Sequence, residues 1–325
     1  MKKNGGAYAR AGVNLEQASR DKAKAFTTVH QFAGFFRANF PKIKNPILVA
    51  STDGIGSKLM LASQPNHHSQ IAADLVYHCV NDILTCGAQP LFFLDHISFK
   101  KWDSKIFHAL IHGFKKACSE TGCSLIGGET AELPEFFSKE KNVKYDLSGT
   151  IIGVVDEKER IDGKKIKPGD AIIGLPSNGL HTNGYTLARK ILLHDLRLKL
   201  TDRLPGSRET LGALLRKPHR CYLKEIQMLQ KKVLIKGMAH ITGGGLIDNL
   251  NRILPHKTKA LINKSSWQPS PLFRFLKQSG KLSEPEAYGV FNMGIGFVLI
   301  VDSQVTDKIL KSIKCYYLGK ITNLQ

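Results

Sequence analysis

Residues 47–58 read Ile-Leu-Val-Ala-Ser-Thr-Asp-Gly-Ile-Gly-Ser-Lys, an apolar run that leads directly into a turn-forming stretch. The four leading aliphatic residues predict a strand, and the two glycines predict a sharp turn where it ends. Asp53 can hold a hard cation through oxygen, and Lys58 can place a positive charge beside a phosphate. Gly54 and Gly56 allow the backbone to approach a ligand closely. The turn therefore suits a magnesium-bound triphosphate, and a plain hairpin turn with an Asp-Gly pair is the alternative.

A second acidic residue, Asp82, lies in a stretch whose apolar residues predict a helix over residues 72–86. Gly87 and Pro90 follow, as is typical of a helix end. Asp74 precedes Asp82 by two helical turns, so both carboxylates are expected on one face. A carboxylate beside an apolar helix face is costly unless it is paired or bound to a metal. We expect Asp82 to be a metal ligand, and a solvent-facing aspartate is the alternative.

A third acidic residue, Glu129, follows two glycines in the stretch Gly127-Gly128-Glu129-Thr130-Ala131-Glu132. A short strand over residues 124–126 comes before them, so we expect Glu129 in open space at the carboxyl end of that strand. Ligands of α/β proteins gather at such ends, and a strand-terminating turn is the alternative. Asp53, Asp82 and Glu129 together provide the hard oxygen ligands that magnesium prefers. If ATP binds, it does so without a P-loop or a Rossmann fingerprint, because neither pattern occurs in the sequence.

Two glycine-containing loops open segments of the second half of the chain. The first is Ser177-Asn178-Gly179-Leu180-His181-Thr182-Asn183-Gly184-Tyr185, which offers many small polar groups ahead of an expected helix. Such a loop suits phosphate or amide recognition, although a lone histidine in a turn is more often structural. The second is Thr242-Gly243-Gly244-Gly245, which could form an anion-binding nest or a plain tight turn. We expect a helix after it, over residues 246–253.

The order of the expected elements indicates an α/β (α+β) protein built in two halves. A charged, turn-rich segment at 156–170 separates them, and we place the domains at residues 1–160 and 161–325. The second half is expected to open with a strand at 171–175 and to close with one at 296–301. The expected strands of the first half are 46–51, 91–95, 124–126 and 147–155, and its expected helices are 15–29, 72–86 and 104–120.

Composition excludes some classes of protein and leaves others open. The net charge is +20, but the basic residues are scattered, and their densest stretch, residues 197–236, contains Tyr222 as its sole aromatic residue. That stretch does not resemble a surface on which the bases of single-stranded nucleic acid stack, so we expect no nucleic-acid partner.

The amino terminus lacks the apolar core of a signal peptide, and the longest strongly apolar run, 297–301, is too short to span a bilayer. Six cysteines without a CxxC pair indicate free thiols in a reducing cytoplasm.

Six stretches, taken in order, resemble the phosphoribosylformylglycinamidine cyclo-ligase (AIR synthetase) family. They are STDGIGSK, VNDILTCGAQPLFFLD, GGETAELP, SNGLHTNGYTLARK, HITGGGLIDNLNRILP and FNMGIGFVLIV. The resemblance implies a two-domain fold of the AIR synthetase type and a homodimer in which the N-terminal sheets combine into a barrel. It implies an ATP-dependent ligase of purine synthesis that phosphorylates the formamide oxygen of formylglycinamidine ribonucleotide. Ring closure then gives aminoimidazole ribonucleotide, with ADP and phosphate released.

The resemblance also assigns roles to residues. Asp53, Asp82 and Glu129 fall on metal–nucleotide positions, with Gly54, Gly56 and Gly128 beside the nucleotide and Lys58 on its phosphates. His181 and Asn183 face the substrate between the domains. The implied cofactors are ATP and Mg²⁺, and the catalytic residues are Lys58 and His181.

The chain departs from the family pattern at several points. A Gly-Gly-Phe-Gly element near the amino terminus reads His30-Gln31-Phe32-Ala33-Gly34-Phe35-Phe36, and a Pro-Gly pair after the GGETAE motif reads Pro134-Glu135. A Pro-Thr-Arg element reads Pro218-His219-Arg220. Since none of these changes removes an expected metal ligand, we expect an active enzyme. The rival hypotheses are a related ATP-using enzyme such as thiamine-monophosphate kinase, a basic nucleic-acid-binding protein and an inactive homologue.

Overall fold

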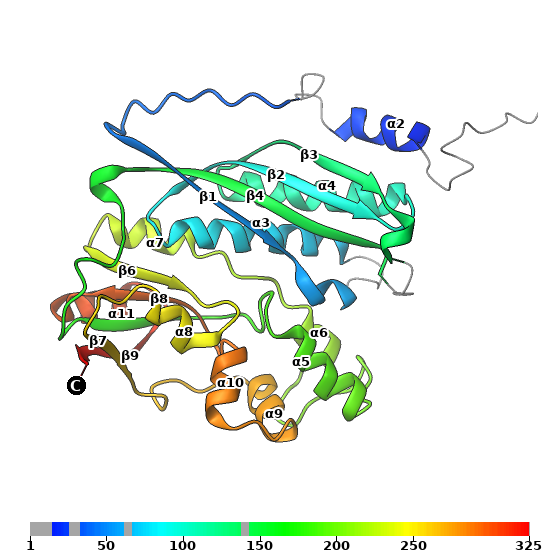
Figure 1. Cartoon of the computed structure of the whole chain (residues 1–325). Coiled ribbons are helices and arrows are strands. Elements are labelled where there is room, and N and C mark those ends of the chain that lie inside the picture. The colour runs from blue at the N-terminus through cyan, green and yellow to red at the C-terminus, as the bar shows by residue number, and fades with distance from the viewer. Residues whose placement is uncertain (1–14, 26–32, 62–66, 138–142, 325) are drawn as a thin grey trace, which may run out of the picture.

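The computed structural model describes residues 15–25, 33–61, 67–137 and 143–324. Each half of the chain forms one sheet with helices packed on it, and the two halves lie against each other along one long seam (Figure 1). The α/β class expected from the sequence is confirmed. Among the described residues, no helix has both the length and the apolar character needed to cross a membrane.

The N-terminal sheet has four strands in the order β1-β4-β2-β3, with β2 and β3 parallel and the other pairs antiparallel. Helices α3 and α4 cover the face of this sheet that points toward the second half, called the inner face below (Figure 1). The helices are α2 (Leu15–Ala25), α3 (His68–Leu84) and α4 (Ser104–Glu120), and the strands are β1 (Pro46–Gly54), β2 (Gln89–Phe99), β3 (Ser124–Glu132) and β4 (Tyr145–Asp156).

The C-terminal half is built on a five-stranded sheet in the order β6-β8-β5-β9-β7. Strand β8, which pairs with β6 and β5, is buried along its whole length. The strands are β5 (Ala171–Pro176), β6 (Ile235–His240), β7 (Thr258–Ile262), β8 (Ile295–Val301) and β9 (Tyr316–Asn323). The helices are α5 (Tyr185–Arg189), α6 (Leu211–Leu215), α7 (Leu223–Gln230), α8 (Gly245–Asn251), α9 (Pro271–Ser279), α10 (Glu284–Val290) and α11 (Thr306–Ser312).

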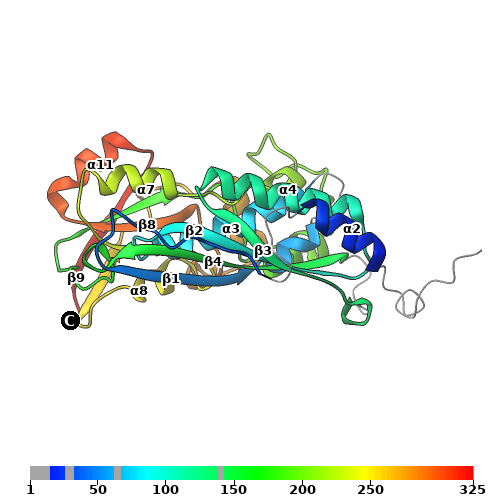
Figure 2. The same cartoon turned by 90° about the horizontal axis from the view of Figure 1, so that it is seen from above.

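Helix α3 occupies the seam between the two halves (Figure 1), and in the view from above it lies below the strands of the N-terminal sheet (Figure 2). Thirteen of its seventeen residues are buried, including the polar residues Asp74, His78 and Asn81. An amphipathic helix on the surface of a protein buries one stripe, whereas this helix is covered by its own sheet on one side and by the C-terminal half on the other. Polar side chains on its second side are therefore available for contacts between the halves.

The prediction that the strand at residues 124–126 ends in a turn is wrong. Strand β3 continues through both glycines to Glu132, and its ladder pairs Gly128 with Asp95 and Glu129 with His96. Position 128 needs a glycine because of local packing: a Cβ atom there would lie only 2.4 Å from Asp95 Oδ1. The glycine makes room for a neighbouring side chain instead of ending the strand. Similarly, β1 extends past the expected limit of 51 to Gly54, and the last part of the helix expected over 15–29 lies outside the described residues.

Asp95 is a buried carboxyl group in the core beneath this sheet. Its side chain is 3% exposed, and neither oxygen has a hydrogen-bond partner among the described residues. Burial raises the pKa of Asp95 to about 7, and the charge of Glu129 contributes in the same direction. The protonated form is therefore the stable one in mildly acidic solution.

We expect this carboxyl group to make the fold less stable as the pH rises. The unfolded chain releases the Asp95 proton near its ordinary pKa, whereas the folded chain holds it until about pH 7. Between those values the unfolded state binds fewer protons, so the free energy of unfolding falls by roughly 4 kcal/mol from this group alone. Asp95→Asn removes the ionisation. Denaturant unfolding at a series of pH values should show the variant gaining stability relative to wild type between about pH 4 and pH 8, and parallel curves would refute the assignment.

Candidate active site

The carboxylates of Asp53 and Asp82 meet at the seam, on either side of one histidine. His78 Nε2 lies 2.6 Å from Asp53 Oδ2 and 3.8 Å from Asp82 Oδ2. Asp53 comes from the end of β1, while His78 and Asp82 lie one helical turn apart on α3. The hydroxyl of Ser51 donates to Asp82 Oδ2 at 3.1 Å. The structure thus brings together two of the three acidic residues that the sequence singled out.

Both carboxylates keep their charge although they are partly buried. Burial acts to raise the pKa of Asp53, but the neighbouring His78 and the N–H of Gly54 outweigh it and leave that pKa below its usual value. Burial likewise acts to raise the pKa of Asp82. The neighbouring His240 and His78 outweigh burial and leave the pKa of Asp82 below its usual value. The side chains remain 41% and 26% exposed. Two charged, accessible carboxylates side by side are suitable ligands for a hard divalent cation.

Three buried histidines, His78, His219 and His240, form a hydrogen-bonded network behind these carboxylates. His78 Nδ1 contacts the hydroxyl of Thr182, and the same hydroxyl lies 3.4 Å from His219 Nδ1. His219 Nε2 lies 3.2 Å from His240 Nε2, and His240 Nδ1 lies 2.8 Å from Asp82 Oδ1. The network therefore runs from one carboxylate to the other through both halves of the chain.

The loop that carries His181 packs directly onto this network. His181 has a φ of 63° and stacks on His219, with ring centroids 4.2 Å apart. The N–H of Asn178 donates to His181 Nε2 at 3.3 Å. Gly296 in β8 leaves the space for the ring, because a Cβ atom there would lie 2.5 Å from His181 Cε1. The side chain is 2% exposed, whereas Asn183 is half-buried beside it.

Lys58 lies away from the position that the sequence suggested. Its Nζ donates to Asp74 Oδ2 at 2.6 Å and to the carbonyl oxygen of Lys217 at 3.0 Å, and the residue is 1% exposed. Asp74 also accepts from the N–H of His219 at 2.9 Å. The physical reason is that burial of either charge alone would be very costly, so the two pair within the seam. The structure does not support a direct contact between Lys58 and a phosphate.

Glu129 does not join the two aspartates within one chain. Strand pairing places Glu129 of β3 in line with His96 of β2, Ser148 of β4 and Gly54 of β1. Glu129 is therefore three strands away from β1, a distance of roughly 14 Å at the usual strand spacing. Asp53 is the neighbour of Gly54 along β1, and successive side chains of a strand point to opposite faces. Asp53 therefore points to the inner face, and Glu129 points to the outer face, where it is exposed.

The three glycines expected beside a nucleotide are also separated. Gly54 and Gly56 follow Asp53 directly, and Gly56 has a φ of 59° at the start of a short 3₁₀ helix (Gly56–Leu61). A Cβ atom on residue 56 would meet no atom within 4 Å, so the backbone there has open space around it. Gly128 lies inside β3 instead, against Asp95. Only the first two belong to the edge of the sheet that holds Asp53.

The sequence analysis missed the histidine network. His78 precedes Asp82 by four residues in an expected helix, a spacing that places both on one face. His240 lies two residues before Thr242 of the Thr242–Gly245 loop, and His219 lies in the stretch Pro218-His219-Arg220. Each of these was a weak signal alone. Only the packing of α3 against β6 and the 177–184 loop brings them together.

The chain is similar to known proteins along nearly its whole length. The family model "AIR synthase related protein, N-terminal domain" matches residues 38–155, and the corresponding C-terminal model matches residues 167–325. A phosphoribosylformylglycinamidine cyclo-ligase from Thermodesulfovibrio yellowstonii is 43% identical over 330 residues, covering 96% of this chain and 95% of the relative.

Solved structures show the same fold at much lower identity. The hydrogenase maturation protein HypE of E. coli superimposes with a TM-score of 0.70 at 15% identity, covering 95% of this chain and 91% of that chain. A HypE structure in complex with ATP gives a TM-score of 0.64 at 16% identity, covering 99% of this chain and 88% of that chain.

Proposed function

The chain belongs to the phosphoribosylformylglycinamidine cyclo-ligase family, and we propose that Asp53 and Asp82 form the metal and nucleotide centre of its activity. It is a ligase of purine biosynthesis that closes the ring of aminoimidazole ribonucleotide from formylglycinamidine ribonucleotide, using ATP. The observation that carries the proposal is the meeting of these two carboxylates around His78 at the seam between the halves. Release of ADP that requires both ATP and formylglycinamidine ribonucleotide tests the activity.

The two aspartates fit a magnesium ion by their chemistry. Both are charged, partly exposed oxygen ligands, and Ser51 supplies a neutral oxygen beside them. A magnesium ion held there would neutralise the charge of the phosphoryl group in transfer. Since His78 occupies the position between the carboxylates, its imidazole would hold them close together while no cation is present, because two adjacent carboxylates repel each other.

The residues around the seam would act mainly by holding the reacting groups of ATP and substrate in position. The formamide oxygen is a poor leaving group until it is phosphorylated, so the two reactive groups must be held in register while water is excluded. We propose that His181 and Asn183 face the substrate at this seam. Asn183 is accessible in the described conformation, whereas His181 becomes accessible only when the 177–184 loop moves outward. Lys58 serves as a positioning residue, because it ties the 56–61 segment to residues 217–219.

We further propose a homodimer that pairs the outer faces of two N-terminal sheets. That face bears exposed apolar side chains, among them Leu48 at 63% and Phe35 at 77% exposure. A groove of about 810 Å³ runs over it, lined by apolar residues of β2 together with Gly128 and Glu129. Apolar patches of this kind mark interaction sites. In such a dimer, Glu129 would serve the nucleotide site of the partner subunit.

Mixing two inactive variants tests this placement of Glu129. Asp53→Asn and Glu129→Gln chains, unfolded together and refolded, form mixed dimers in which one of the two sites keeps both carboxylates. The mixture should regain about a quarter of the wild-type rate, because about half of randomly formed two-fold dimers are mixed. A mixture that stays as inactive as the separate variants would show that Glu129 does not act across the dimer. Size-exclusion chromatography checks that the dimers form.

The remaining assignments rest on composition and chain order. We propose that the two domains meet between residues 160 and 161, in the segment that connects β4 with β5. Placement of the enzyme in the cytoplasm is supported by the six cysteines, all of which are free thiols.

A further inference from the structure

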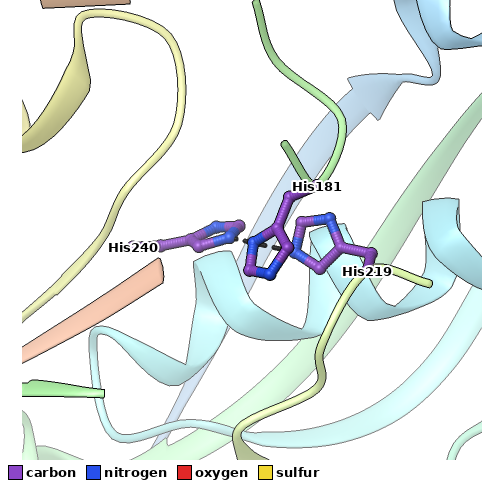
Figure 3. A group of neighbouring side chains, drawn as sticks. All are labelled: His181, His219 and His240. Carbon is purple, nitrogen blue, oxygen red and sulfur yellow. Dashed lines mark hydrogen bonds between the residues drawn. The ribbon is translucent and has the colours of Figure 1, made fainter. Parts of the chain in front are cut away.

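Three of the buried histidines converge from separate parts of the C-terminal half. His181 lies in the 177–184 loop, His219 lies between α6 and α7, and His240 ends β6 (Figure 3). One ring nitrogen of each lies within 4.8 Å of those of the other two. All three are at least 95% buried.

The hydrogen-bond partners fix which nitrogens carry lone pairs. Asn81 Oδ1 accepts from the N–H of Tyr222, so its amide nitrogen donates to the carbonyl of Arg220 and to His219 Nε2 at 3.1 Å. His219 Nε2 is therefore an acceptor. His240 Nδ1 faces the carboxylate Asp82 Oδ1 and carries a hydrogen, which leaves the lone pair of a neutral ring on Nε2.

His219 Nε2 and His240 Nε2 therefore lie 3.2 Å apart with no hydrogen to share between them, since the lone pair of His219 Nε2 accepts from the Asn81 amide. Burial also disfavours a charged imidazolium at His219 and lowers the pKa of that ring well below its usual value. Two acceptors at this distance repel unless a cation lies between them. A tetrahedral zinc ion with Zn–N bonds near 2.05 Å holds neighbouring nitrogens about 3.3 Å apart. The spacing of His219 and His240 matches that edge.

We propose that His181, His219 and His240 form a binding site for a borderline divalent transition metal, with Zn²⁺ as the representative ion. Imidazole ligands favour Zn²⁺, Ni²⁺ and Cu²⁺ over Mg²⁺, whereas the neighbouring carboxylates favour Mg²⁺. The ion replaces the contact between Asn81 and His219 Nε2, and the Asn81 amide keeps its bonds to Arg220 and Tyr222. His181 would contribute Nδ1, which is buried and has no hydrogen-bond partner among the described residues. Ligation there places the ring hydrogen on Nε2, so the ion also replaces the contact with the N–H of Asn178.

A bound ion would hold the 177–184 loop against β6. His181 is the loop's own ligand, and His240 is anchored to Asp82 through its other nitrogen. A carboxylate that fixes the second nitrogen of a ligating histidine is the usual arrangement around zinc. The site is therefore coupled to the carboxylate centre without sharing a ligand with it.

Equilibrium dialysis of the apo protein against Zn²⁺, without nucleotide or substrate, tests the proposal independently of the enzymatic activity. Wild type should bind a single tightly held ion per chain. His219→Thr, which removes one of the three imidazoles, should bind it more than ~100-fold more weakly. His194→Ala is the matched control, because that histidine is 85% exposed and lies outside the cluster, and it should leave the affinity unchanged.

Two further measurements guard against a variant that merely misfolds. Circular dichroism of His219→Thr should match wild type, and Zn²⁺ should raise the unfolding temperature of wild type but not of His219→Thr or His240→Asn. Co²⁺ in the wild-type site should show the intense visible absorption of tetrahedral nitrogen coordination. Failure of wild type to bind Zn²⁺ tightly would overturn the proposal, and so would unchanged affinity in folded His219→Thr.

Discussion

Replacing Asp53 with asparagine is expected to lower kcat/KM for ring closure by roughly 10³-fold, the size of effect seen when one preorganised charge interaction is removed from a transition state. Asparagine keeps the shape of the side chain and its oxygen atom but loses the charge that a divalent cation requires. His78 retains Thr182 and Asp82 as neighbours, so the histidine network survives the change. The rate of ADP release at saturating magnesium measures the effect.

A matched control separates loss of the site from loss of the fold. Asp307→Asn removes a carboxylate from an exposed position in the first turn of α11, far along the chain from the seam. It should retain the wild-type rate. Asp53→Asn should keep its circular dichroism spectrum and its unfolding temperature within a few degrees of wild type. Full activity in the Asp53 variant would remove this residue from the centre.

Replacing Lys58 with methionine is expected to lower the free energy of unfolding by about 3–5 kcal/mol. The change leaves Asp74 buried without its counter-charge and removes the bond to the carbonyl oxygen of Lys217. A lysine that served mainly to bind phosphate would give the opposite result, namely unchanged stability and a raised KM for ATP. Denaturant unfolding together with the KM for ATP distinguishes the two roles.

The double variant Lys58→Met/Asp74→Leu provides the control for this prediction. Removing both charges abolishes the cost of an unpaired buried carboxylate, so the double variant should be more stable than Lys58→Met alone. The N–H of His219 and the amide of Gln70 lose their acceptor in it, so recovery should be incomplete. A double variant that is less stable than the single one would refute the pairing.

Much of the fold could be read from local patterns in the sequence. The apolar stripe over 104–120 matches α4 at both ends, and the aliphatic run at 147–155 lies within β4. Strand ends were harder to place. Glycine signals a turn in most sequences, but Gly128 is required by the Asp95 carboxyl group on the neighbouring strand, a contact that no local pattern reveals.

The candidate site was only partly predictable for a similar reason. Asp53 and Asp82 stood out because each is an acid beside an apolar element, and the structure brings them together. The placements of Lys58 and Glu129 depended on tertiary contacts, a buried aspartate in one case and the face of a strand in the other. The histidines came from four segments whose proximity is set by the packing of α3 between the two halves.

In the proposed centre, Asp53 and Asp82 jointly hold the cation that accompanies ATP. Calorimetric titration of ATP into the protein, with and without magnesium, tests this proposal most directly, because the ratio of the two affinities measures the coupling between cation and nucleotide. Wild type should bind ATP much more tightly with magnesium present, and this gain should vanish in both Asp53→Asn and Asp82→Asn. An undiminished gain in either variant would contradict the account.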